Sequence, residues 1–141
     1  MTPASAVSTA VTFVWLGMVL AISFMETPLK FRAPDVTLRI GLGIGRLVFR
    51  ALNIAEAVLA AVLVIAIIVG SPRTGAIIAG CVAIVMLAVQ IAVVRPRLSR
   101  RSDRILAGGD APRSRTHYVY VGLETVKVIA LIMTGSLLLA S

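Results

Sequence analysis

Acidic and basic residues lie inside long apolar stretches of this chain, where charges are rare. Glu56 is in the second apolar stretch, and Glu124 and Lys127 are in the fourth. Because an ionised group is costly in hydrocarbon, such residues usually face a bundle interior and pair with one another. Carboxylates beside an ammonium group could hold helices together, carry a proton, or bind an ion or a polar headgroup.

The depth of these residues predicts that they meet. Counting about 1.5 Å per residue from the outer end of each stretch places Glu56 and Lys127 at nearly the same depth. Glu124 comes out slightly deeper, and Arg50 lies close to the cytoplasmic headgroups. We therefore expect the ion pairs Glu56–Lys127 and Arg50–Glu124. The expected intramembrane polar cluster consists of Arg50, Asn53, Glu56, Gln90, Glu124 and Lys127.

Helical spacing predicts two polar stripes that face each other, because residues three or four apart share a helix face. The stripe on the second stretch is Arg46, Arg50, Asn53 and Glu56. The stripe on the fourth stretch is His117, Tyr120, Glu124 and Lys127. The cluster is interpreted either as structural, holding the helices in register, or as the lining of a pocket open to the cytoplasm.

A rim of polar residues is expected where the stripes reach the cytoplasm. Glu26 lies next to Lys30 and Arg32 and is predicted to form an ion pair at the cytoplasmic rim, or alternatively to lie at the mouth of the pocket, closed by Arg46. His117 is the only histidine, and a single histidine is a poor metal site, so we interpret it as an interfacial, hydrogen-bonded residue. Trp15 is interpreted as an interfacial or packing aromatic. The expected rim consists of Glu26, Lys30, Arg46, His117 and Tyr120.

The amino-acid composition indicates whether the apolar stretches lie in water or in a membrane. Of the 141 residues, 59% are hydrophobic and 14% are charged. So much apolar surface exceeds what one small soluble core can bury. We predict one all-α domain, a polytopic membrane protein with a four-transmembrane-helix bundle. The expected spans are 6–25, 50–69 with a cytoplasmic helical extension over 36–49, 75–94 and 118–139, with a basic cytoplasmic loop over 95–116.

The charge distribution predicts the orientation. The net charge is +8, and the first and third connections carry most of it, whereas the tails and the second connection contain only Arg73. The positive-inside rule then places both basic connections in the cytoplasm and both termini outside, in the inner (plasma) membrane. Anionic lipid at the cytoplasmic face is an expected partner. Nucleic acid is not, because the basic segments lack interleaved aromatic residues.

Patterns for known reactions are missing from the sequence. There is no CxxC pair and no histidine-rich segment, so we predict no catalytic residue and no metal site. The alternation Gly41, Gly43, Gly45 follows no strand and is not a phosphate loop. Gly41 and Gly45 instead favour close contact with a neighbouring helix, or alternatively a bend where the helix leaves the membrane.

Several short motifs follow one another along the chain. They are Trp15-Leu16-Gly17, Glu26-Thr27-Pro28-Leu29-Lys30-Phe31, Gly45-Arg46-Leu47-Val48-Phe49, Arg95-Pro96-Arg97-Leu98 and the segment from His117 to Glu124. This order resembles a family of small four-helix bacterial membrane proteins. More distantly, it is similar to the membrane domain of copper-resistance D proteins and of small haem-pathway oxidases. Those relatives use histidines near their helices, whereas this chain has only His117. We therefore expect no cofactor, with haem or copper as the alternative that the resemblance implies.

Short loops and the lack of a catalytic constellation favour an accessory or assembly subunit of a larger membrane complex, or of a homo-oligomer. The ionisable cluster favours a different hypothesis, a proton-coupled small transporter or a protein that binds an ion or a lipid. The distant resemblance adds a third, a haem- or copper-linked redox membrane protein.

Overall fold

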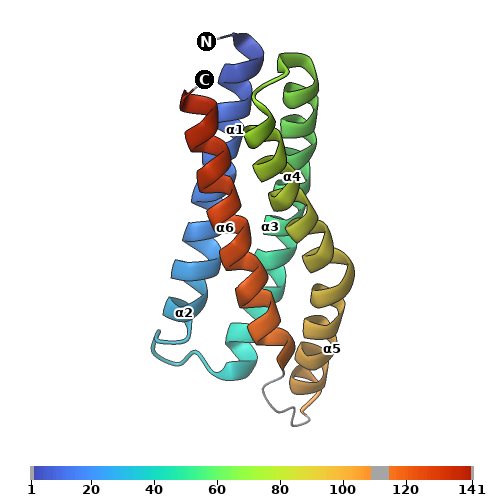
Figure 1. The fold of residues 1–141 in the computed structure, drawn as a ribbon. Coiled ribbons are helices and arrows are strands. Elements are labelled where there is room, and N and C mark those ends of the chain that lie inside the picture. The colour runs from blue at the N-terminus through green and yellow to red at the C-terminus, as the bar shows by residue number, and fades with distance from the viewer. Residues whose placement is uncertain (1, 109–114, 141) are drawn as a thin grey trace.

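Four long helical segments form a bundle in the computed structural model, which describes residues 2–108 and 115–140 (Figure 1). Each segment is long and apolar enough to cross a membrane. The described residues contain no strand. The prediction of an all-α bundle with four membrane-spanning helices is therefore confirmed. The segments are Pro3–Lys30, Leu38–Gly70, Thr74–Leu106 and Tyr118–Ala140.

Two of the four segments are interrupted by a π-helical stretch. The first consists of α1 (Pro3–Val19), the π-helix η1 (Leu20–Glu26) and the short α2 (Thr27–Lys30). The second segment is the single helix α3 (Leu38–Gly70). The third consists of α4 (Thr74–Val89), the π-helix η2 (Gln90–Val94) and α5 (Arg95–Leu106), and the fourth is α6 (Arg115–Ala140).

Side chains at the helix starts explain two of these boundaries. The hydroxyl of Thr2 accepts a hydrogen bond from the backbone N–H of Ser5, at 3.1 Å, and caps α1. Thr37 caps α3 in the same way through Ile40. Both hydroxyls satisfy backbone donors that a helix start leaves unpaired. Ser71 ends α3 in the left-handed conformation, with φ at 46°.

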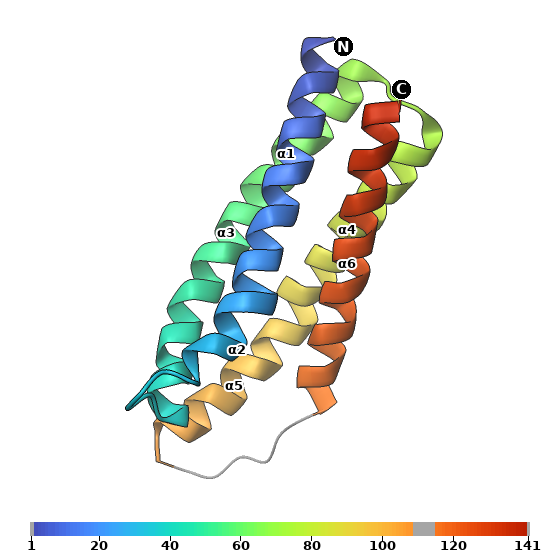
Figure 2. The same cartoon turned by 90° about the vertical axis from the view of Figure 1, so that its left-hand side faces the viewer.

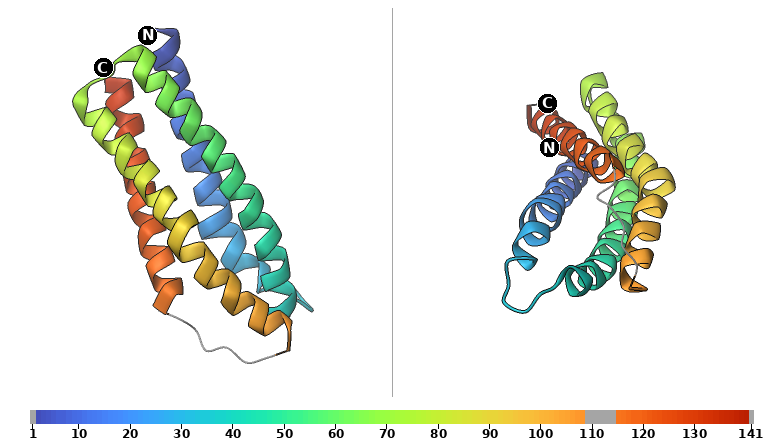
Figure 3. Two further views of the ribbon diagram at one scale, coloured as in Figure 1. Left: turned by 90° about the vertical axis from the view of Figure 1, so that its right-hand side faces the viewer. Right: turned by 90° about the horizontal axis from the view of Figure 1, so that it is seen from below.

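Both termini and the α3–α4 connection lie at one end of the bundle, whereas α2, α5 and the starts of α3 and α6 lie at the other (Figures 1 and 2). We call the second end the basic end. Its described positions include Lys30, Arg32, Arg39, Arg46, Arg50, Arg95, Arg97, Arg100, Arg101 and Arg104. Between the ends, α1 packs against α3 and α6, and α4 packs against α6 (Figure 3).

The segment over 95–106 was expected to be part of a loop, and this prediction is wrong. It forms α5, which continues the third segment beyond η2. Pro96, which has no backbone N–H, is the second residue of α5 and lies directly after η2, where the helical hydrogen-bond pattern changes. Leu98 packs with the buried group around Phe49 and Leu52, so one face of this arginine-rich helix is held against α3. Residues 109–114 of the expected loop lie outside the described residues.

Buried apolar side chains fill the middle of the bundle. Trp15, Leu63 and Leu131 are fully buried there, and Ala83 gives α4 a small surface for close approach. Large apolar residues also cover the outside, where Leu47 is 73% exposed and Ile68 is 72% exposed. This arrangement suits a helix bundle whose outer surface faces lipid.

The end of the first segment packs against glycines of α3, in the close contact predicted for Gly41 and Gly45. The Phe31 ring occupies the space that a side chain at Gly41 would fill. A Cβ atom at Gly45 would lie 3.0 Å from Lys30 Nζ. Gly43, by contrast, has open space beside it. The missing side chains at two of the three glycines therefore let α2 and the following residue lie against α3.

These glycines allow a matched comparison. Gly43→Ala is expected to stabilise the protein by about 0.5–1 kcal/mol, because alanine is the better helix former. Gly41→Ala gains the same propensity but must displace the Phe31 ring, so it is expected to be about 1–3 kcal/mol less stable than Gly43→Ala. Thermal unfolding in detergent micelles measures both. Equal stability of the two variants would contradict the packing of Phe31 on Gly41.

Candidate functional site

The side chain of Lys127 lies at the centre of a polar group inside the bundle. Its Nζ atom donates to Glu56 Oε2 at 2.5 Å and to Gln90 Oε1 at 2.8 Å. It also lies 2.6 Å from Glu124 Oε1. A lysine ammonium has three N–H donors, so these three oxygens use all of them. Lys127 and Glu56 are 0% exposed, and Gln90 and Glu124 are 1% exposed.

The first segment supplies two further members. The indole N–H of Trp15 donates to Glu56 Oε2 at 2.8 Å. The Ser23 hydroxyl donates to Glu124 Oε2 at 2.7 Å. Each carboxylate therefore receives a hydrogen bond from the first segment as well as the charge of Lys127. We call Trp15, Ser23, Glu56, Gln90, Glu124 and Lys127 the buried polar cluster, and its members come from all four membrane-spanning segments.

The π-helical stretches contain two of these residues. Ser23 lies in η1 and Gln90 is the first residue of η2. A π-helical turn accommodates an extra residue and so rotates the following side chains relative to an α-helix. Both π-helical stretches therefore lie at the depth of the buried polar cluster.

The structure brings together four of the six residues expected in the cluster, which are Glu56, Gln90, Glu124 and Lys127. Asn53 is half-buried and makes no hydrogen bond to the cluster among the described residues. The predicted Arg50–Glu124 pair is wrong, since Arg50 is exposed and Glu124 pairs with Lys127. At about 100° per residue, two successive steps of three residues place Arg50 about 120° around the helix from Glu56.

Sequence reasoning missed Trp15 and Ser23 as members of the cluster. Trp15 was interpreted as an interfacial or packing aromatic. Its ring is fully buried in the core, as the packing alternative predicts, but the bond from its N–H to a carboxylate was not predicted. A comparison of residue depths would have predicted the contact between Trp15 and Glu56. Counted from the helix ends at the termini side, Trp15 and Glu56 lie at roughly 18 Å and 21 Å. A buried tryptophan also requires an acceptor for its indole N–H.

The rim residues are arranged in separate contacts. Glu26 lies 3.7 Å from Lys30, which is the expected pair. The alternative, with Arg46 closing a pocket at Glu26, is wrong, because Arg46 instead lies 2.6 Å from Asp103 of α5. Tyr120 is buried and packs edge-on against the Phe49 ring. The His117 side chain lies outside the described residues.

The aromatic rings at the basic end contact two cations. Lys30 Nζ lies 5.9 Å from the Phe49 ring centre, and the Arg95 guanidinium lies 4.8 Å from the same centre. Arg95 is also 5.8 Å from the Tyr120 ring. Such contacts stabilise a cation in surroundings where water is scarce.

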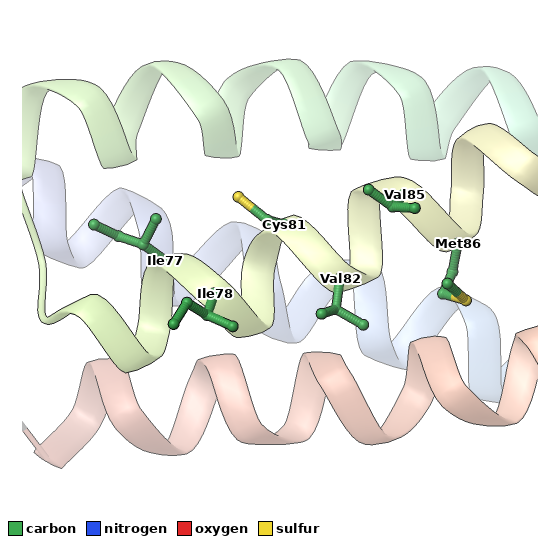
Figure 4. Close-up of a pocket in the computed structure, with 6 residues that line it drawn as sticks. All are labelled: Ile77, Ile78, Cys81, Val82, Val85 and Met86. Atoms are coloured by element: carbon green, nitrogen blue, oxygen red, sulfur yellow. The ribbon is translucent and has the colours of Figure 1, made fainter.

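The outer surface of α4 has two shallow apolar grooves. One has a volume of about 310 Å³ and is lined by Ile77, Ile78, Cys81, Val82, Val85 and Met86, which all project from α4 (Figure 4). The other, of about 330 Å³, lies between α4 and α6 and includes the small residues Gly75, Ala79 and Ala130. Neither groove includes a member of the buried polar cluster.

Within residues 2–108 and 115–140, no group of three or more histidine, cysteine or acidic side chains is arranged to hold a metal ion. Comparisons with protein-family models, with curated proteins and with solved structures find no match to this chain. The features of the molecule that bear on function are therefore the buried polar cluster, the basic end and the outer surface.

Proposed function

We propose that this chain is an accessory or assembly subunit of a larger membrane complex. The supporting observation is that the members of the buried polar cluster form hydrogen bonds and ion pairs with one another. All three donors of the Lys127 ammonium contact side chains of this chain, and Glu124 receives bonds from Ser23 and Gln90 as well. Such a cluster specifies one arrangement of four helices and keeps little hydrogen-bonding capacity for a transported molecule.

The surface is consistent with this role. Only residues 71–73 connect α3 to α4, and seven residues connect α2 to α3, so little backbone protrudes from the bundle there. What the protein presents is helix surface. The groove between α4 and α6 combines small residues with larger apolar walls, which is the pattern that allows close approach of another transmembrane helix.

Purification from native membranes in a mild detergent tests this proposal. We expect the tagged protein to elute in a stoichiometric complex with a larger membrane protein. Met133→Trp places a bulky ring over the groove between α4 and α6 and should release the subunit, whereas Val58→Trp on the exposed face of α3 should not. Elution of the wild-type protein as a monomer, or equal behaviour of the two variants, would refute the proposal.

The proposal includes the inner membrane as the location, with both termini outside the cytoplasm. The distribution of lysines and arginines along the sequence supports this orientation. Apart from Lys127, twelve of them lie within 30–50 or 95–115, and only Arg73 lies in the connection between α3 and α4. Alkaline phosphatase fused after Ala140 is expected to be active, and the same enzyme inserted after Ala33 is expected to be inactive. The reverse pattern would contradict this orientation.

One observation favours a second function, that of a proton carrier. Glu56 Oε1 is buried and has no hydrogen-bond partner among the described residues. The cluster also has two carboxylates and one ammonium, and the next cation, Arg95, lies on the rings of Phe49 and Tyr120. One proton bound at Glu56 would balance the charges of the cluster, and its exchange would couple protonation to helix packing.

The only tryptophan of the chain reports on this site directly, because Trp15 bonds to Glu56. For a proton carrier, the Trp15 emission should change with pH in the wild-type protein and become insensitive to pH in Glu56→Gln. Proton flux into liposomes should be lost in the same variant. Emission that does not respond to pH in the wild-type protein would exclude this second function.

A further inference from the structure

Two cations at the basic end lie against one aromatic ring, as described above for Lys30, Arg95 and Phe49. The Lys30 side chain is only 10% exposed, and Arg95 is half-buried. Their positions are determined by the packing around them. Lys30 Nζ occupies the space left by the missing side chain of Gly45, and Arg95 begins α5 immediately after η2.

These two charges are poorly neutralised by the described residues. The carboxylate nearest to Lys30 belongs to Glu26, and its 3.7 Å separation exceeds hydrogen-bonding distance. Arg95 makes no ion pair within residues 2–108 and 115–140. Two further acidic residues are paired with other cations. Asp103 lies 2.6 Å from Arg46, and Glu124, which acts electrostatically on Arg95, lies 2.6 Å from Lys127. The site therefore has two cations, one adjacent carboxylate that is too far for a hydrogen bond, and unused N–H donors.

The depth of the site matches that of lipid headgroups. Arg95 lies 21 residues after Thr74, at the start of α4, which corresponds to roughly 31 Å of helix, about the thickness of the hydrocarbon core. Exposed apolar side chains precede Lys30 on the first segment. Met25 is 56% exposed and Leu29 is 52% exposed. Cations at headgroup level beside exposed apolar side chains match the two parts of a phospholipid.

We propose that Lys30 and Arg95 form a binding site for the phosphate group of an anionic phospholipid. Charge-assisted N–H bonds from the ammonium and the guanidinium would hold the phosphate oxygens. The acyl chains would lie along Met25 and Leu29. The rings of Phe49 and Tyr120 hold Arg95 in place for this contact. The inference is independent of the proposed role as an accessory subunit.

Native mass spectrometry of the full-length protein in detergent tests the site, with dioleoyl phosphatidylglycerol as the probe and dioleoyl phosphatidylcholine as the neutral comparison. We expect one phosphatidylglycerol to be retained in preference to phosphatidylcholine. Lys30→Gln and Arg95→Gln should each weaken this preference about fivefold, as expected for the loss of one basic residue near the membrane surface. The control Arg50→Gln removes an exposed arginine of the basic end and should change it less than twofold.

The outcomes separate specific binding from general attraction. An equal loss in Arg50→Gln and Arg95→Gln, or no preference for phosphatidylglycerol, would overturn the site. Inorganic phosphate should not displace the lipid at millimolar concentration, and displacement would overturn the assignment to a phospholipid. Because a variant could fail to fold, Trp15 emission in phosphatidylcholine micelles is measured for each one. Lys30→Arg, which keeps the charge, should bind as the wild-type protein does if the site is correct.

Discussion

Replacing Lys127 with methionine is expected to destabilise the bundle by about 3–5 kcal/mol, because two buried carboxylates lose the one cation that pairs with them among the described residues. Glu56 and Glu124 both contact the Lys127 ammonium, and all three side chains are at most 1% exposed. No water is at hand in the middle of a bilayer to solvate the remaining charges. Unfolding by sodium dodecyl sulfate in mixed micelles, followed by Trp15 fluorescence, measures the loss.

Arg50→Met is the matched control for this experiment. It removes a cation from the exposed side of α3 and is expected to change the stability by less than about 0.5 kcal/mol. The triple variant Glu56→Gln, Glu124→Gln, Lys127→Met removes all three charges and should recover most of the stability lost by Lys127→Met. If the triple variant is no more stable than the single one, unbalanced charge is not the cause of the effect.

Replacing Trp15 with alanine is expected to destabilise the protein by about 3–5 kcal/mol, because a large and fully buried ring is removed. Trp15→Phe keeps most of the ring but removes the indole N–H that bonds to Glu56 at 2.8 Å. Its expected cost is about 1.5–3 kcal/mol, the loss of one hydrogen bond to a charged group, because Lys127 still donates to the same oxygen. Circular dichroism replaces fluorescence as the measurement, since these variants contain no tryptophan.

The control for the tryptophan series is Phe24→Ala. Phe24 lies in the same membrane-spanning segment but is 42% exposed. Its side chain has no polar group and cannot hydrogen-bond to the cluster. Its replacement should cost less than about 1 kcal/mol. A Trp15→Phe variant as stable as the wild-type protein would show that the Trp15–Glu56 hydrogen bond does not contribute to stability.

Much of the fold follows from hydrophobicity and length. Stretches of about twenty apolar residues must satisfy their backbone hydrogen bonds internally in lipid, so the four helices could be predicted without tertiary information. The arginine-rich segment over 95–106 was the exception. Its charges were interpreted as a loop, although an amphipathic helix can place arginines on one side and Leu98 on the other. Local charge density alone does not distinguish these structures.

The sequence also predicted the burial of four rare polar residues. Glu56, Gln90, Glu124 and Lys127 had to face the interior, since lipid cannot solvate them, and equal depth predicted the Glu56–Lys127 pair. Only the tertiary structure decided the rest of the network. The rotation of α3 directs Arg50 outward, and the packing of α1 brings Trp15 and Ser23 to the carboxylates. Depth follows from counting residues, whereas rotation and partner choice depend on how all four helices pack together.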